Sequence, residues 1–274
     1  METSMYYATH RTTYAHEVYN ADYDHSKPVE IEDGLDKLVL ISLKHLRYAN
    51  RHTIERYIAL ESKPCNIEKA LKRLYEASLI EKYVVERENK RVHSIYMLSP
   101  SGHKAMNTTP GKKTVSLVKA MKNASLAQTL VAFAQSSHGK RFQISFNRRL
   151  HNFTAPGYYK KHLKKGGVLH LVVVPVCYES NIEQIALKLM RFEIQCQRKK
   201  KASEQWMMVL ACTDMQCMCM TYKALASLRE LKNNDYLYVV DEVTQHSNVS
   251  EWIYSCYTTP EGKVAYKNMR LDLE

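Results

Sequence analysis

Long apolar stretches are missing from this 274-residue sequence. The longest, Val168–Val176, is interrupted by His170 and Pro175, whereas a helix that crosses a bilayer needs roughly 20 consecutive apolar residues. The first 20 residues also lack the apolar segment of a secretory signal peptide. We therefore expect a soluble, cytoplasmic chain that makes no contact with a membrane.

The signatures of several enzyme classes are missing as well. The eight glycines form no phosphate-binding loop, and neither a G-x-S-x-G nor an H-E-x-x-H motif occurs. The seven cysteines are an odd number and most lie in hydrophobic segments, which argues against a disulfide framework. Cys212, Cys217 and Cys219 lack the second ligand pair that a zinc site needs, so we interpret them as buried small side chains. The sequence thus predicts no metal and no cofactor.

Positive charge is present in excess and is unevenly distributed. Lysine and arginine number 40 against 28 acidic residues, and residues 111–274 hold 24 of the basic residues but only 13 of the acidic ones. Eight basic residues and no acidic ones lie between positions 138 and 165, and another basic run covers 198–201. Two basic zones indicate a polyanionic partner, with nucleic acid the first candidate. An acidic protein partner, or a solvated surface with no partner, is the alternative.

The hydrophobic pattern predicts an N-terminal domain over 34–107, which follows a loose arm over 1–33. Three segments carry apolar residues every three or four positions, and two segments with alternating apolar residues follow them. These five segments cover residues 35–48, 53–60, 65–77, 81–86 and 92–98. Three helices followed by a β-hairpin is the order of a winged helix-turn-helix domain.

Two stretches carry a family resemblance. Residues 67–80, IEKALKRLYEASLI, resemble the third helix and the following strand of winged-helix regulators, although Ser78 stands where many of these proteins have glycine. Residues 96–102, YMLSPSG, resemble the segment that follows the hairpin, or wing, of these proteins. The resemblance implies that the third helix enters the major groove of double-stranded DNA, which is about 12 Å wide.

The residues predicted to contact DNA lie on the outer face of the third helix, at the hairpin tip and at the start of the second helix. They are Asn66, Lys69, Lys72, Arg73, Lys90, Arg91, Arg51 and Thr53. Thr53 is also predicted to be the N-cap of the second helix. A secondary basic surface is predicted on a loop over 138–165, and it comprises Arg148, Arg149, Lys160, Lys161, Lys164 and Lys165. Whether this loop contacts nucleic acid or an acidic protein stays open at this stage.

The second half of the sequence is predicted to consist of a linker over 108–115 and an α/β domain over 116–274. Predicted strands cover 142–146, 168–176, 206–212 and 236–240, and predicted helices cover 116–134, 182–196 and 222–232. Strands that alternate with helices predict a mostly parallel central sheet. Tyr158 and Tyr159 are expected to pack or to stack on bases, and His162 and His170 to be loop or hydrogen-bonded core residues.

A second resemblance concerns residues 172–179, VVVPVCYE, and the following helix with Lys188 and Phe192. With the preceding domain, they resemble the replication-relaxation family of plasmid and mobile-element proteins. In that family a winged helix is joined to a domain related to PD-(D/E)xK nucleases. Here valines occupy the positions of the acid-x-Lys motif, and Glu179 and Asp214 do not pair by spacing. We therefore expect a degenerate nuclease-like domain used for binding or dimerisation.

These observations predict a non-catalytic, sequence-specific protein that binds double-stranded DNA. The expected setting is transcriptional regulation, or replication and transfer of a plasmid or mobile element, in association with the nucleoid or a plasmid. Homodimerisation is expected, because two half-sites about one helical turn apart multiply specificity. Two alternatives stay open. One is a metal-dependent nuclease of the PD-(D/E)xK type with displaced carboxylates, and the other is a protein-protein adaptor whose winged helix touches no DNA.

Overall fold

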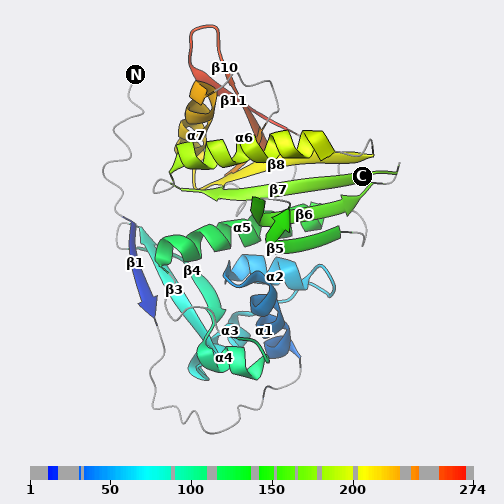
Figure 1. Cartoon of the computed structure of the whole chain (residues 1–274). Helices are drawn as coiled ribbons and strands as arrows, with labels where there is room; N and C mark the ends of the chain where they lie inside the picture. The colour runs from blue at the N-terminus through cyan, green and yellow to red at the C-terminus, as the bar shows by residue number, and fades with distance from the viewer. Residues whose placement is uncertain are drawn as a thin grey trace. The chain divides into compact units, whose positions relative to one another are not determined.

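The computed structural model of the chain divides into two units, residues 1–124 and 125–274 (Figure 1). It describes residues 12–17, 31, 34–87, 90–109, 116–136, 142–150, 153–163, 166–177, 181–199, 203–228, 236–240 and 253–269. The division falls inside helix α5 (Leu117–Ser136) and not in the predicted linker, of which residues 110–115 lie outside the described part. None of the described helices is long and apolar enough to span a bilayer.

The first unit combines short helices with an antiparallel sheet. Its helices are α1 (Leu35–Leu46), α2 (Arg51–Ile58), α3 (Glu68–Glu76) and α4 (Pro100–Ala105). Its strands are β1 (Thr12–Glu17), β2 (Ala49–Asn50), β3 (Ile80–Arg87) and β4 (Lys90–Leu98), in the order β1-β3-β4-β2. The three helices and the hairpin predicted from the sequence are present. Strand β1 corrects the prediction of a loose arm, because six of the arm's residues pair with β3.

The helices of this unit form where apolar residues repeat at helical spacing. In α1 the residues Val39, Leu43 and Leu46 are buried, and α1 contacts α2, α3 and β4. In α3 the buried residues are Ala70, Leu71 and Leu74, all on one side of the helix. Burying a leucine or valine side chain contributes about 1.5–3 kcal/mol. The opposite side of α3 is therefore the side left for solvent or a partner.

The YMLSPSG segment has a clear physical role in this unit. Ser99 is the N-cap of α4, because its Oγ accepts a hydrogen bond from the backbone N–H of Gly102 at 3.0 Å. A Cβ atom at Gly102 would overlap the carbonyl oxygen of Leu79, so only glycine fits there. Ser78 has a φ of 56°, in the left-handed region that glycine adopts at least cost. Glycine would therefore adopt this conformation at less cost than the serine present here.

The second unit is built on a seven-stranded mixed sheet. Its strands are β5 (Phe142–Leu150), β6 (Phe153–His162), β7 (Val168–Val176), β8 (Glu204–Cys212), β9 (Tyr236–Val240), β10 (Ile253–Thr258) and β11 (Val264–Asn268), in the spatial order β11-β10-β9-β8-β7-β6-β5. Its helices besides the second part of α5 are α6 (Ile182–Lys199) and α7 (Met215–Leu228).

The prediction of a mostly parallel sheet is wrong. Only β7–β8 and β8–β9 are parallel, and the other four neighbouring pairs are antiparallel. The predicted loop over 138–165 contains the β5–β6 hairpin, and β10–β11 is a second hairpin that the pattern did not reveal. Hairpin strands are antiparallel by construction, so two missed hairpins change the class of the sheet.

Helices cover both faces of this sheet. On one face, where α6 lies along the sheet (Figure 1), Val172 and Val174 of β7 form a core with Leu189 and Phe192 of α6 and with residues of α7. On the other face, the ring of Tyr159 lies 6.0 Å from that of Phe133 in α5. A strand that is covered on both sides is apolar throughout, which accounts for the continuous hydrophobic pattern of β7.

Candidate nucleic-acid interface

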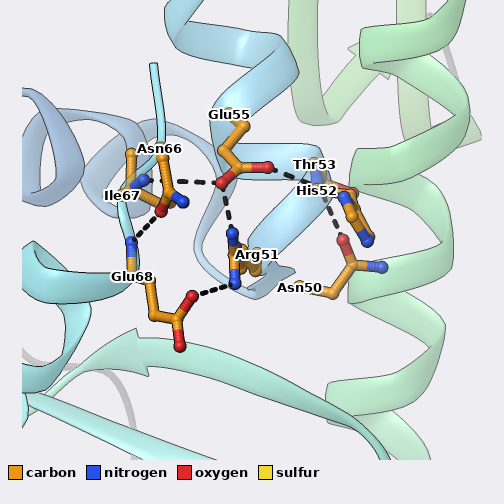
Figure 2. A network of polar contacts seen from close by, with 8 residues as sticks. All are labelled: Asn50, Arg51, His52, Thr53, Glu55, Asn66, Ile67 and Glu68. Carbon is orange, nitrogen blue, oxygen red and sulfur yellow. Dashed lines mark hydrogen bonds and ion pairs between the residues drawn. The ribbon is translucent and has the colours of Figure 1, made fainter.

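A network of polar contacts joins the start of α2 to the start of α3 (Figure 2). Arg51 donates a hydrogen bond from Nε to Oε1 of Glu55 at 2.9 Å and another from Nη1 to Oε2 of Glu68 at 2.7 Å. The same Glu55 oxygen accepts a hydrogen bond from the backbone N–H of Ile67 at 3.4 Å. The hydrogen bond to Glu55 raises the pKa of Arg51 above its ordinary value. Glu55 thus connects α2 to the residue that precedes α3.

The N-cap of α2 is Asn50 and not Thr53, so the predicted cap is wrong. Oδ1 of Asn50 accepts a hydrogen bond from the backbone N–H of Thr53 at 2.8 Å (Figure 2). The helix begins at Arg51 because the short strand β2 ends at Asn50. Thr53 is only 2% exposed, and its buried position gives no support to its predicted contact with DNA.

Arg73, another predicted DNA contact, is engaged within the protein. Its guanidinium donates to both carboxylate oxygens of Asp36 in α1, with distances of 2.6 Å for Nη2–Oδ1 and 3.2 Å for Nε–Oδ2. Asn66 also makes a local contact, because its Oδ1 accepts a hydrogen bond from the backbone N–H of Glu68 at 2.9 Å. Arg51, Asn66 and Arg73 therefore position the helices of this unit.

Two of the lysines predicted to contact DNA lie on the outer face of α3. Lys69 and Lys72 are both exposed, on the side of the helix opposite to the buried Ala70 and Leu74. Nζ of Lys72 lies 3.8 Å from Oε1 of Glu76, a long ion pair whose lysine side chain is 76% exposed. Exposed ion pairs of this kind contribute about 0–1 kcal/mol to stability, so the lysine readily exchanges its carboxylate partner for another anion.

The predicted contacts at the hairpin tip fall largely outside the described residues. Lys90 and Arg91 lie in strand β4, opposite Arg87 and Glu86 of β3. Their side chains, together with residues 88 and 89, lie outside the described part of the chain. Their contact with DNA stays a prediction.

The secondary basic surface is not one surface, which corrects the sequence interpretation. Residues 160 and 161 are in strand β6, so their side chains point to opposite faces of the sheet. Lys160 is half-buried on one face, whereas Lys161 is only 5% exposed on the other. Arg149 is exposed on β5. Lys164 and Lys165 lie outside the described residues.

Arg148, the remaining member of that predicted surface, belongs to a cluster of rings. Its guanidinium lies 4.5 Å from the centroid of the Tyr158 ring, and its Nη1 donates to Oε1 of Gln143 at 3.1 Å. A cation over an aromatic face contributes about 0.5–2 kcal/mol. Tyr158 is buried, and this burial raises the pKa of its hydroxyl.

The sequence interpretation missed the chemistry of His170. Its Nδ1 is hydrogen-bonded to the hydroxyl of Tyr158 at 2.6 Å, and its ring stacks on Trp206 at a centroid distance of 4.1 Å. Its Nε2 is buried and has no hydrogen-bond partner among the described residues, so this histidine is not the satisfied core residue that was expected. Burial lowers the pKa of His170 to about 4, opposed by Glu204, and nearby cations including Lys160 lower it further. The sequence signal that could have indicated this role was the position of a histidine inside an otherwise apolar strand.

The residues invoked for the nuclease alternative are only partly described. Asp214 is at the start of α7, where its Oδ1 accepts a hydrogen bond from the backbone N–H of Cys217 at 2.9 Å. Glu179 lies outside the described residues. Within the described part of the chain, no three His, Cys, Asp or Glu side chains are grouped so that they could hold a metal ion. Cys212 and Cys217 are buried, as predicted, whereas Cys219 is only half-buried.

Comparisons of the chain with models of protein families, with curated proteins and with solved structures found no match. The described residues offer two cationic surfaces: the outer face of α3 in the first unit, and the side of the β5–β6 hairpin that carries Lys160 and Arg148 in the second.

Proposed function

We propose that the first unit is a winged helix-turn-helix module that binds double-stranded DNA without cleaving it. The observation that carries the proposal is the placement of Lys69 and Lys72, two exposed cations on the one side of α3 that does not face the core. A helix that presents cations outward and apolar residues inward can enter a groove lined by phosphates.

The architecture around α3 supports this role. The elements follow the order α1-β2-α2-α3-β3-β4, and β3 pairs antiparallel with β4, so a hairpin directly follows α3 along the chain. The short strand β2 pairs with β4. Helix α3 has nine residues, which corresponds to a length of about 14 Å. An α-helix has a diameter of about 10–12 Å with its side chains, which fits a major groove about 12 Å wide.

The residues of this surface divide into contacting and positioning residues. Lys69 and Lys72 contact DNA, with Lys90 and Arg91 of the hairpin as further proposed contacts. Arg51 and Arg73 hold α3 through Glu55, Glu68 and Asp36, because their guanidinium groups are already bonded to carboxylates. This division revises the contact set that the sequence predicted.

The proposed setting is transcriptional regulation, or replication and transfer of a plasmid or mobile element, as the sequence resemblance implies. Homodimerisation belongs to the same proposal, since paired half-sites add specificity. The second unit is proposed to provide additional contacts without catalysis.

Fluorescence anisotropy with a labelled duplex of random sequence tests the proposal. We expect binding at low salt and a strong decrease in affinity as salt rises, because each neutralised phosphate releases counterions. The double variant Lys69→Ala/Lys72→Ala should weaken binding about tenfold or more and reduce the slope of log affinity against log salt by about 2. The matched control Lys37→Ala/Lys104→Ala removes two exposed lysines from α1 and α4 and should leave α3-dependent binding nearly intact.

Two outcomes overturn the proposal in different ways. Absence of duplex binding at low salt, or equal losses in both double variants, would favour the adaptor hypothesis. Plasmid nicking that requires Mg²⁺ or Mn²⁺ and is abolished by Glu179→Ala would favour the nuclease hypothesis.

A further inference from the structure

A row of polar and aromatic side chains crosses four strands of the sheet in the second unit. Strand pairing places Gln143 of β5 opposite Lys160 of β6, Lys160 opposite His170 of β7, and His170 opposite Trp206 of β8. Directly opposite residues point to the same face of a sheet, with Cβ atoms about 4.5–5.5 Å apart. We call these four residues the polar row. Gln143 at the β5 end is exposed, and His170 within the sheet is buried.

Further polar groups flank the polar row on the same face. Tyr158 and His162 lie two residues before and after Lys160 on β6, so all three side chains share a face. Arg148 is an odd number of residues from Gln143, and a regular β5 would place the two on opposite faces. Asn147 has a φ of 50°, which interrupts the alternation. Arg148 consequently reaches Gln143, to which it donates a hydrogen bond at 3.1 Å.

His170 contributes an unsatisfied polar atom to the row. Its Nδ1 is used by Tyr158 and its ring is covered by Trp206, so Nε2 is the free position of the imidazole. This nitrogen has no hydrogen-bond partner among the described residues, although the residue is only 7% exposed. Native proteins rarely leave buried polar atoms without a partner, since each one costs about 1–3 kcal/mol. The polar row therefore offers a ligand one unpaired nitrogen, Nε2 of His170, at its buried end.

A pocket of about 430 Å³ lies at the exposed end of the polar row and is lined by Phe142, Gln143, Lys160 and His162. Gln143, Lys160 and His162 supply an amide, a lysine and an exposed imidazole on the face of the polar row. Phe142 pairs opposite Lys161, so its side chain points to the other face of the sheet, where its ring stacks on that of Tyr159 at a centroid distance of 6.2 Å. β5 is the edge strand of the sheet, which leaves this end of the row open to a ligand.

We propose that the pocket and the polar row bind single-stranded nucleic acid. Lys160 and Arg148 neutralise a backbone phosphate, Gln143 supplies hydrogen bonds, and a base stacks on the exposed imidazole of His162. Base stacking on an aromatic ring beside cations is the recurring chemistry of single-strand binding, and a duplex would hide the faces of its bases. The proposal goes beyond the duplex contact of α3 and uses residues of the other unit only.

The experiment measures binding of labelled oligothymidylate of 15 nucleotides to the full chain at low salt. We expect Lys160→Gln to weaken binding several-fold by removing a phosphate contact. His162→Ala should weaken it several-fold by removing the ring on which a base stacks. Arg149→Gln removes a neighbouring exposed cation of β5 and is the matched control, with an expected change of less than twofold.

The α3 variant separates this proposal from the duplex proposal. Lys69→Ala/Lys72→Ala should retain oligothymidylate binding while it loses duplex binding, whereas His162→Ala should show the reverse. Should Lys160→Gln lose the circular dichroism signal of the folded chain, Arg148→Gln, which removes the other phosphate contact, provides the same test.

Three results would overturn the single-strand proposal. The first is wild-type affinity for oligothymidylate in both Lys160→Gln and His162→Ala. The second is equally strong competition by polyglutamate, which would make the site one for acidic proteins. The third is saturation by thymidine monophosphate or inorganic phosphate with no added affinity from a longer strand, which would reduce the site to a phosphate pocket.

Discussion

Arg73 of α3 forms a two-pronged ion pair with Asp36 of α1, with Nη2–Oδ1 and Nε–Oδ2 distances of 2.6 and 3.2 Å. The side chain of Asp36 is only 10% exposed, whereas that of Arg73 is 51% exposed. The carboxylate is thus nearly buried, and among the described residues its ion pair is formed with the guanidinium of Arg73. The pair fixes the proposed DNA-contacting helix to the first helix of its unit.

Replacement of either partner is expected to destabilise the first unit. Arg73→Met should lower the free energy of unfolding by about 1–2 kcal/mol, because it leaves a nearly buried carboxylate without its partner while the exposed arginine end limits the loss. Asp36→Asn should have a similar effect. Urea denaturation followed by circular dichroism, applied to both single variants and the double variant, gives the coupling energy. Strictly additive losses would show that the pair contributes nothing.

Glu55 is expected to matter for both stability and DNA affinity. Glu55→Ala removes the acceptor shared by Arg51 and Ile67, and should cost about 1–2 kcal/mol of unfolding free energy. It should also weaken duplex binding, since α3 loses its connection to α2. The control is Glu61→Ala, an exposed acidic residue after the same helix, which should change stability by less than about 0.5 kcal/mol. Equal effects of the two substitutions on urea midpoint and duplex affinity would contradict this role.

Elements with a strong local pattern could be predicted from the sequence. β7 has the bounds predicted for it, because its apolar, β-branched run is set by burial on both faces. α1 and α3 were also predicted, from apolar residues at helical spacing. The outward position of Lys69 and Lys72 followed from that same spacing. Local periodicity was sufficient in each of these cases.

Features that depend on distant contacts could not be predicted. Strand β6 contains Pro156 and Gly157, which are turn-forming residues, and Gly157 is tolerated there because it makes room for the side chain of Leu126 in α5. The hydrogen bonds of Arg73 are set by Asp36, 37 residues away. In each case a residue type that indicates one role locally is used for another by a partner distant in the sequence.

His170 is expected to titrate far below an ordinary histidine. Its pKa is lowered to about 4 by burial, with Lys160, Arg148 and His162 also lowering it and Glu204 opposing them. The imidazole of His170 is protonated near pH 6.5 in the unfolded chain but only near pH 4 in the folded chain. The free energy of unfolding therefore decreases as the pH falls from about 6.5 towards 4, by at most about 3 kcal/mol. Above pH 6.5 the imidazole is neutral in both states, and this loss is absent.

Nuclear magnetic resonance measures this titration directly. The His170 signal, assigned by its loss in His170→Gln, should shift with a midpoint near pH 4 while the protein stays folded. Urea midpoints of the wild type should fall more steeply between pH 7 and 5 than those of His170→Gln. A midpoint near 6.5 would show that the imidazole is hydrated and not enclosed by Tyr158 and Trp206.

The central claim is that the outer face of α3 contacts duplex DNA, and lysine footprinting tests it most directly. The full chain is reductively methylated with and without a saturating duplex, and the modification of each lysine is measured by mass spectrometry. Lys69 and Lys72 are predicted to be protected several-fold by the duplex, while Lys37 and Lys104 react at unchanged rates. Unchanged reactivity of Lys69 and Lys72 in the saturated complex would contradict the account.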